Sequence, residues 1–243
     1  MVDNLTYKQF GEKAILIEWQ AIIDDEILND VLFFKDKITA NKEIQFVDLI
    51  QGYNSLTIIY TSLITNLEKE IFLLKSIYTS TLKVQKQDFF QWEIPVCYDL
   101  EFGIDLDEIS KKLKICNDEI IKLHSDPVYK VFFIGFLPGF LYLGGLDKLL
   151  YVDRKSNPRL NVPKGSVAIG GKQTGVYPSN SAGGWNIIGK TPVCFFNVDK
   201  EKPCFAKAGD FIKFTPISLD EFYQLEKEVI TNKYQFTKTL IDA

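Results

Sequence analysis

Residues 165–185 read GSVAIGGKQTGVYPSNSAGGW and carry the clearest structural signal in the chain. Six of these 21 residues are glycine, and short runs such as SVAI and VYP lie between them. A helix cannot run through this composition, because glycine and proline both disfavour helical backbone. Short strands separated by glycine and proline turns are typical of a β-barrel or a β-sandwich.

The pair Gly170–Gly171 followed by Lys172 invites comparison with the phosphate-binding loop G-x-x-x-x-G-K-[ST]. Counted from Gly165, the position that requires lysine is Gly171, and Lys172 is followed by Gln173 instead of a hydroxyl residue. No helix can follow, so we reject a phosphate-binding loop of this type. The glycines indicate tight barrel corners, or a ligand-facing loop with exposed N–H groups, or both.

The same character extends outward from this stretch. Residues 134–190 hold eleven of the fifteen glycines, and short apolar runs recur on both sides, among them YKVFFI, WNII, VCFF and DFIKF. Three helices are expected around these strands. The first is capped by Asp105 with Glu108, the second is NDEIIKLH ending at His124, and the third is capped by Ser218 with Glu221.

The N-terminal part has a different pattern. Strand and helix signals alternate through residues 1–85 in the order β-β-α-β-β-α, and Thr65 with Glu68 forms a possible capping box for the second helix. VQKQD, residues 84–88, reads as a linker. We therefore predict a small α+β domain over 1–85 and a mainly β domain over 86–243.

Composition excludes several classes of protein. The net charge is −4 and no basic cluster is evident, which argues against a nucleic-acid partner. No signal peptide or membrane span is apparent, so we expect a cytoplasmic protein. The four cysteines form no C-x-x-C pair and read as reduced and mostly buried. With a single histidine, His124, we expect no metal site.

Two further features bear on a site. Only two of the 28 basic residues are arginine, Arg154 and Arg159, and each is either a bidentate anion binder or part of an ordinary ion pair. GFLPGFLYLGGL, residues 135–146, places Phe136 and Phe140 among glycines and a proline. This segment is either a buried aromatic plug or one wall of a pocket.

Taken together, GFLPGFLYLGGL and the later NPRLNVPKGSVAIGGKQTGVYPSNSAGGWNIIGKTP resemble the signature of the bacterial family of 5-oxoprolinase B subunits. That family includes the sporulation kinase inhibitor KipI and domains of the allophanate hydrolase subunit 1 type. IPVCYDLEFGIDLDEIS and LHSDPVYKVFFIGF resemble it as well. The resemblance covers nearly the whole chain and is densest over 91–197. Ala182 departs from it, since the family usually has proline before GGW.

The resemblance implies a fold and an activity. It implies an N-terminal α+β domain followed by a cyclophilin-like β-barrel, working beside a C subunit of related fold and a separate A subunit. The implied reaction is the ATP-dependent opening of 5-oxoproline to glutamate, with ATP bound at the level of the complex and this chain inactive alone. The alternatives are a KipI-type inhibitor of a sporulation sensor histidine kinase and a urea carboxylase or allophanate hydrolase component.

The implied substrate, a lactam with one carboxylate, suggests roles for particular residues. Arg159 would bind the carboxylate bidentately. His124 has the ordinary pKa suited to proton transfer near neutrality, and Lys164 is the third catalytic candidate. The candidate substrate-binding residues are Lys172, Gln173, Tyr177, Phe136 and Phe140.

Each of these roles has a structural alternative. His124 could simply end its helix and bond a carbonyl. Lys164 and Lys172 could be solvated turn residues, and Tyr177 could be a core residue with a satisfied hydroxyl.

Overall fold

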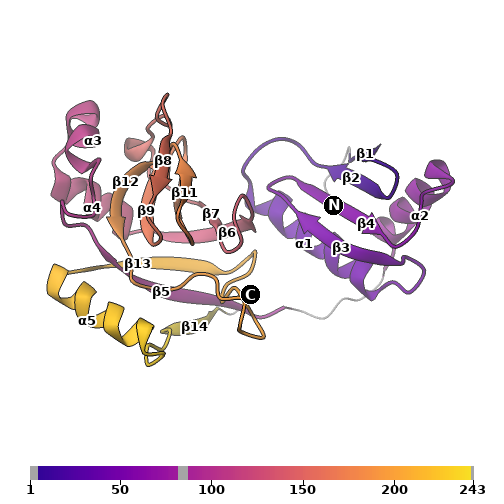
Figure 1. The fold of residues 1–243 in the computed structure, drawn as a ribbon. Helices are drawn as coiled ribbons and strands as arrows, with labels where there is room; N and C mark the ends of the chain where they lie inside the picture. Colours follow the sequence, from indigo (N-terminus) through magenta and orange to yellow (C-terminus); the bar gives the residue numbers. More distant parts are fainter. Residues whose placement is uncertain (1–4, 82–86, 242–243) are drawn as a thin grey trace. The chain divides into compact units, whose positions relative to one another are not determined.

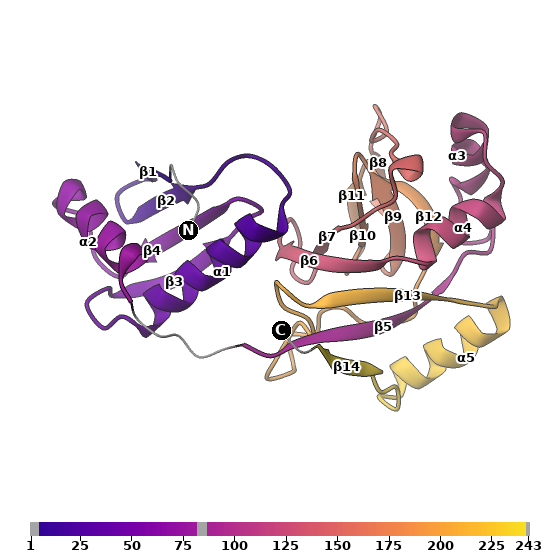
Figure 2. The same ribbon diagram turned by 180° about the vertical axis from the view of Figure 1, so that it is seen from behind.

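The structure is a computed structural model that describes residues 5–81 and 87–241. The chain divides into two compact units, Met1–Gln87 and Asp88–Ala243 (Figures 1 and 2). Three of the five residues of the predicted linker, 84–86, lie outside the described residues.

The N-terminal unit is a four-stranded antiparallel sheet with two helices. The strands lie in the order β1-β2-β4-β3. The inward side chains of β2 and β4 and the apolar faces of both helices form a single core. The elements are β1 (Thr6–Gln9), β2 (Ala14–Glu18), α1 (Asp25–Ala40), β3 (Phe46–Gln51), β4 (Ser55–Tyr60) and α2 (Leu67–Thr79). This is the predicted order of strands and helices.

The capping box predicted for α2 is wrong. The helix begins after Asn66, whose side-chain oxygen accepts a hydrogen bond from the Lys69 backbone at 3.0 Å. Asparagine is among the strongest N-cap residues, and here it replaces Thr65 in that role. Asn66, the residue after Thr65, therefore sets the start of α2.

Lys37 on α1 is an unusual core residue because its charged side chain is only 2% exposed. Its Nζ donates to the carbonyl oxygens of Tyr78 and Ser80, both at 2.7 Å. These carbonyls lie where α2 ends and would otherwise lack helical donors. A cation at a helix C-terminus also interacts favourably with the helix dipole. Lys37 thus joins the two helices of the N-terminal unit.

Replacing Lys37 with methionine is expected to lower the free energy of unfolding by about 1–2 kcal/mol, because one buried and one half-buried carbonyl lose a charged donor while the alkyl packing is kept. Urea unfolding monitored by circular dichroism measures this. Lys35→Met, a change at a half-buried lysine of the same helix, serves as the control. Equal stability of the wild type and Lys37→Met would contradict the role given to Lys37.

The C-terminal unit is a closed β-barrel. Its sheet runs β12-β9-β10-β7-β6-β13-β5, and β12 also pairs with β5, which closes these seven strands; β14 adds to β5 from outside. The strands are β5 (Phe89–Cys97), β6 (Val128–Ile134), β7 (Leu141–Gly144), β9 (Ser166–Gly170), β10 (Gln173–Val176), β12 (Asn186–Lys190), β13 (Phe211–Ile217) and β14 (Lys238–Ile241). The predicted class, an α+β part followed by a mainly β barrel, is confirmed.

Several elements surround this barrel. They are α3 (Leu106–Leu113), α4 (Asn117–Ser125), the 3-10 helix η1 (Lys148–Leu150), the two-stranded ribbon of β8 (Arg159–Val162) and β11 (Ser181–Gly183), and α5 (Leu219–Ile230). In Figure 1, α3 and α4 lie on the side of the barrel formed by β12, where α3 packs on β12 and α4 on β13, and α5 runs along β5. None of the described helices is long and apolar enough to cross a membrane.

Two of the sequence-predicted caps have different outcomes. Ser218 and Glu221 form the reciprocal capping box expected for α5. Asp105 does precede α3, but its side chain makes no capping bond. The carboxylate contacts other parts of the barrel instead, as described below. The cysteine prediction also needs correction: all four are free, but only Cys97 is fully buried.

The glycine-rich stretch forms β9, β10, β11 and the turns between them. Gly165 has φ +83°, and a Cβ there would lie 2.4 Å from the Thr191 carbonyl oxygen. Gly171 has φ +65° in the turn between β9 and β10. Both positions require backbone that other residues rarely adopt. Gly165 and Gly171 therefore lie at tight corners of the barrel, which is one of the two roles predicted for these glycines.

Candidate functional site

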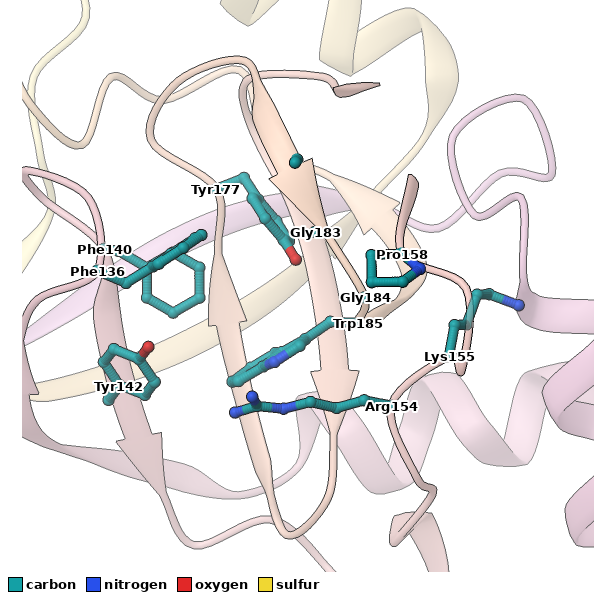
Figure 3. A pocket seen from close by; sticks show the side chains of 11 residues that line it. Phe136, Phe140, Tyr142, Arg154, Lys155, Pro158, Tyr177, Gly183, Gly184 and Trp185 are labelled. Carbon is teal, nitrogen blue, oxygen red and sulfur yellow. The ribbon is translucent and has the colours of Figure 1, made fainter. Parts of the chain in front are cut away.

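A pocket of about 290 Å³ opens on the barrel unit between the β6–β7 connection, the segment before β8, and the stretch from β10 to β12 (Figure 3). It combines aromatic rings, glycines and basic side chains. Its lining residues are Phe136, Phe140, Tyr142, Arg154, Lys155, Pro158, Tyr177, Ala182, Gly183, Gly184 and Trp185.

Three buried aromatic residues form the rigid part of the wall. The ring of Phe140 meets Tyr177 edge to face at 5.4 Å and Trp185 at 5.5 Å, measured between ring centroids. All three belong to one small hydrophobic cluster with Val162 and Ala168. Edge-to-face contacts add to the free energy gained by burial alone, so packing within the chain holds these three rings together.

Glycines allow these rings to lie so close to the backbone. A Cβ at Gly183 would lie 2.2 Å from the hydroxyl oxygen of Tyr177, and a Cβ at Gly170 would lie 2.8 Å from the Trp185 ring. Larger residues would displace the rings and change the pocket. The glycines of the stretch therefore shape the pocket wall as well as the barrel corners.

Arg154 supplies positive charge at the aromatic wall. Its guanidinium lies 5.4 Å from the centre of the Trp185 ring (Figure 3). Within the described part of the chain no carboxylate lies at ion-pair distance from Arg154, whereas Lys155 is paired with Asp105 and Glu108. An arginine stacked on an aromatic face keeps its N–H donors free for an anion. Arg154 is the cation available to a ligand in this pocket.

Phe136 lies at the edge of the pocket in a strained conformation. Its φ is +67° and its side chain is 62% exposed. The ring makes an edge-to-face contact with Phe140 at 5.7 Å. Left-handed backbone at a residue other than glycine costs about 1–2 kcal/mol and is concentrated at functional sites.

Three of the eight sequence-predicted site residues, Phe136, Phe140 and Tyr177, line this pocket. Tyr177 is a core residue, as one of its two readings has it, and it also lines the pocket (Figure 3), so its substrate-binding role stays a prediction. Burial raises the pKa of Tyr177, and a hydrogen bond from the Trp185 backbone opposes that effect. The hydroxyl is therefore neutral at physiological pH and can donate a hydrogen bond.

His124 does not line the pocket. It is fully buried in α4, where Nδ1 lies 2.7 Å from the Tyr98 hydroxyl and Nε2 lies 2.7 Å from Thr174 Oγ1. The Thr174 hydroxyl donates to the Ala168 carbonyl, so Nε2 carries the proton and Nδ1 accepts from Tyr98. Burial lowers the pKa of His124 to about 3. This geometry favours a structural role, through two hydroxyl partners.

Arg159 is held by a buried carboxylate. Its Nη2 and Nη1 donate to the two oxygens of Asp105 at 2.6 and 3.0 Å. The guanidinium thus makes the bidentate contact expected of it, but with a residue of its own chain. Of the two readings of Arg159, the geometry favours the ion pair over a substrate clamp.

The remaining three predicted residues lie elsewhere on the barrel. Lys164 is exposed beside a second hollow, with Nζ 3.4 Å from Cys194 Sγ. Lys172 is exposed in the turn after Gly171. Gln173 is buried, and among the described residues its Nε2 has no hydrogen-bond partner. None of the three lines the aromatic pocket.

Sequence reasoning missed Arg154, Tyr142 and Trp185 as members of a single site. Scarcity of arginine was a usable signal, since it singled out Arg154 together with Arg159. The two arginines differ in their partners, because Arg159 pairs with Asp105. That aspartate lies 54 residues earlier in the chain, so the sequence does not indicate the pairing. Trp185 ends the glycine-rich stretch, and only the folded backbone places it opposite Phe140.

Comparison with known proteins agrees with this architecture. A 5-oxoprolinase B subunit from Bacillus subtilis is 34% identical over 231 residues, which cover 91% of this chain and 96% of that protein. A 5-oxoprolinase B subunit from Haemophilus influenzae is 40% identical over 172 residues, covering 71% and 80% of the two chains.

Solved structures give the same fold. Urea carboxylase of Kluyveromyces lactis superposes with a TM-score of 0.80 at 17% identity over 98% of this chain, which spans 24% of that larger chain. At this identity the likeness concerns the fold alone. The model of the carboxyltransferase domain, subdomain C and D, matches residues 5–206. The chain therefore belongs to the carboxyltransferase domain family, subdomains C and D, which it shares with the 5-oxoprolinase B subunits.

Proposed function

We propose that this chain is the B subunit of an ATP-dependent 5-oxoprolinase that converts 5-oxoproline to glutamate together with the C and A subunits. The proposal draws on relatives named as 5-oxoprolinase B subunits at 34–40% identity. In this proposal the chain is inactive alone and acts as one component of a hydrolase complex. It works in the cytoplasm, where ATP is available.

One observation supports the proposal most strongly: the available guanidinium of Arg154 stands at the wall of a small aromatic pocket. 5-Oxoproline is a flat five-membered lactam with one carboxylate. The Arg154 fork matches a carboxylate, and the rings of Phe140 and Trp185 match the apolar face of the lactam ring. A pocket of about 290 Å³ suits a ligand of this size.

The chemistry assigns different tasks to this chain and to its partners. The γ-phosphoryl group passes from ATP to the lactam oxygen and ADP leaves. A first water then attacks the activated carbon and the carbon–nitrogen bond breaks, which frees the amino group and leaves γ-glutamyl phosphate. A second water hydrolyses this acyl phosphate, and glutamate and phosphate are released. The Tyr177 hydroxyl is a candidate donor to the lactam oxygen. His124 is buried and cannot accept the proton from water, so the base comes from a partner subunit or from another group.

The fold shared with urea carboxylase makes urea the natural competing substrate. Urea has no carboxylate and offers Arg154 nothing to neutralise. A pocket that selects 5-oxoproline should therefore reject both urea and the amide of 5-oxoproline, while proline, which keeps the ring and the carboxylate, should bind more weakly because it lacks the lactam oxygen.

Calorimetric titration of the chain assembled with the C and A subunits tests this order of affinities. We expect 5-oxoproline to bind more tightly than proline, and urea and the 5-oxoproline amide to give no heat of binding. Binding of urea with no response to 5-oxoproline would exclude the oxoprolinase assignment. A silent titration together with tight binding to a sporulation sensor kinase would favour the inhibitor alternative.

A further inference from the structure

Asp105 is a buried carboxylate, 1% exposed, that lies at the start of α3 outside the pocket lining. Besides the two bonds from Arg159, it receives Lys155 Nζ at 3.0 Å and the Ile187 backbone N–H at 2.7 Å. These four contacts use the acceptor capacity of both oxygens. Burial by itself raises the pKa of Asp105, but the hydrogen bonds from Arg159, Ile187 and Lys155 together lower it.

The partners of Asp105 line the pocket or lie close in sequence to residues that do. Lys155 and Arg159 both belong to segment 154–159, of which Arg154, Lys155 and Pro158 line the pocket. Ile187 lies in β12, two residues after the lining residue Trp185. The Asp105 carboxylate therefore links segment 154–159, which carries Arg154, to β12, which begins directly after Trp185.

Backbone contacts reinforce this arrangement. The Lys155 N–H donates to the Gly184 carbonyl at 2.6 Å, and the Asn186 side chain donates to the Asp153 carbonyl at 3.0 Å. Arg154 itself, between these two points, is joined to Trp185 by its ring contact. The position of Arg154 thus depends on how firmly its neighbours are held.

We propose that Asp105 is a positioning residue that fixes Arg154 against Trp185 by holding Lys155, the residue after Arg154, and Arg159, the last residue of segment 154–159. For its kinetic part, this inference rests on the proposed 5-oxoprolinase function. Asp105 and Glu108 together balance the charges of Lys155 and Arg159. Among the residues that the structure describes, Arg154 is left as the pocket cation without an ion pair, held in place without being neutralised.

The structural part of the proposal is tested on the isolated full chain by NMR of isotope-labelled tryptophan. Three indole resonances are expected, and Trp185→Phe assigns the one from the pocket. Arg154→Ala should shift that resonance. Asp105→Asn, which cannot accept from both cations, should shift it in the same direction, and should have no further effect when Arg154 is already alanine. An unmoved Trp185 resonance in a folded Asp105→Asn protein would overturn the proposal.

The kinetic part uses the assembled complex. We expect Asp105→Asn to raise the KM for 5-oxoproline about tenfold with kcat within about twofold, since Arg154 contacts the carboxylate equally before and during reaction. In the Arg154→Ala background the same change should leave KM unaltered. Independent effects that multiply in the double variant would overturn the positioning role. Arg159→Lys keeps the charge and loses the bidentate contact. It is combined with Arg154→Ala in the same NMR and KM comparisons, so that the outcome does not depend on the folding of Asp105→Asn alone.

The two proposals fail in different ways. A wild-type complex that forms no glutamate contradicts the proposed function, and the Trp185 resonance still decides the role of Asp105. A complex that forms glutamate but shows multiplying KM effects contradicts the positioning role alone.

Discussion

Arg154→Ala is expected to raise the KM for 5-oxoproline about 50-fold in the assembled complex, with little change in kcat. A charge-assisted contact to a carboxylate contributes about 2–3 kcal/mol, and each 1.4 kcal/mol is about tenfold in KM. The carboxylate keeps its charge throughout the reaction, so its loss should weaken substrate and transition state alike. Among single changes in the pocket we expect this to have the largest effect on activity.

Two variants sharpen this experiment. Arg154→Lys keeps the charge but not the planar fork, and we expect it to recover part of the lost affinity. Lys111→Ala removes an exposed cation from α3, away from the pocket, and should leave KM at the wild-type value. A wild-type KM in Arg154→Ala, or an equal rise in Lys111→Ala, would rule out a specific carboxylate contact.

The stability of the barrel unit should fall steeply in mild acid because of His124. Its folded-state pKa is lowered to about 3. In the unfolded chain the value returns to about 6.5. Below about pH 6.5 the unfolded state therefore binds a proton that the folded state excludes. The free energy of unfolding is consequently highest above that pH, as far as His124 contributes to it, and falls as the pH is lowered.

Between about pH 7.5 and about pH 4.5 this single group should cost the fold about 2.5 kcal/mol. Chemical denaturation of wild type and His124→Gln at both pH values isolates the effect from that of other titrating groups. We expect the variant to be the less stable protein at the higher pH and the difference to shrink by about 2.5 kcal/mol at the lower pH. Parallel losses in the two proteins would show that His124 is accessible to protons in the native state.

The fold was largely predictable because its signals are local. Glycine and proline mark the turns of the barrel, and the capping box at Ser218 and Glu221 lies within four consecutive residues. The predictions that failed involve a choice between neighbours or a distant partner. Asn66 outcompetes Thr65 as a cap, and the Asp105 side chain bonds Arg159 instead of α3.

The site was less predictable because its members differ only in their tertiary partners. Arg154 and Arg159 lie five residues apart in the same polar segment, and the sequence gives both the same chemistry. A carboxylate from the start of α3 engages one and leaves the other over an indole. His124 was selected for its ordinary pKa, and only the packing of Tyr98, Thr174 and Phe214 around its ring shows why that pKa does not apply.

The formation of glutamate from radiolabelled 5-oxoproline tests the central claim most directly. The purified chain is mixed with the C and A subunits and ATP, and each protein is omitted in turn. We expect glutamate and ADP to appear together in the complete mixture, and no glutamate when this chain or ATP is left out. A complete, folded complex that consumes no 5-oxoproline, or one that forms glutamate equally well without this chain, would contradict the account.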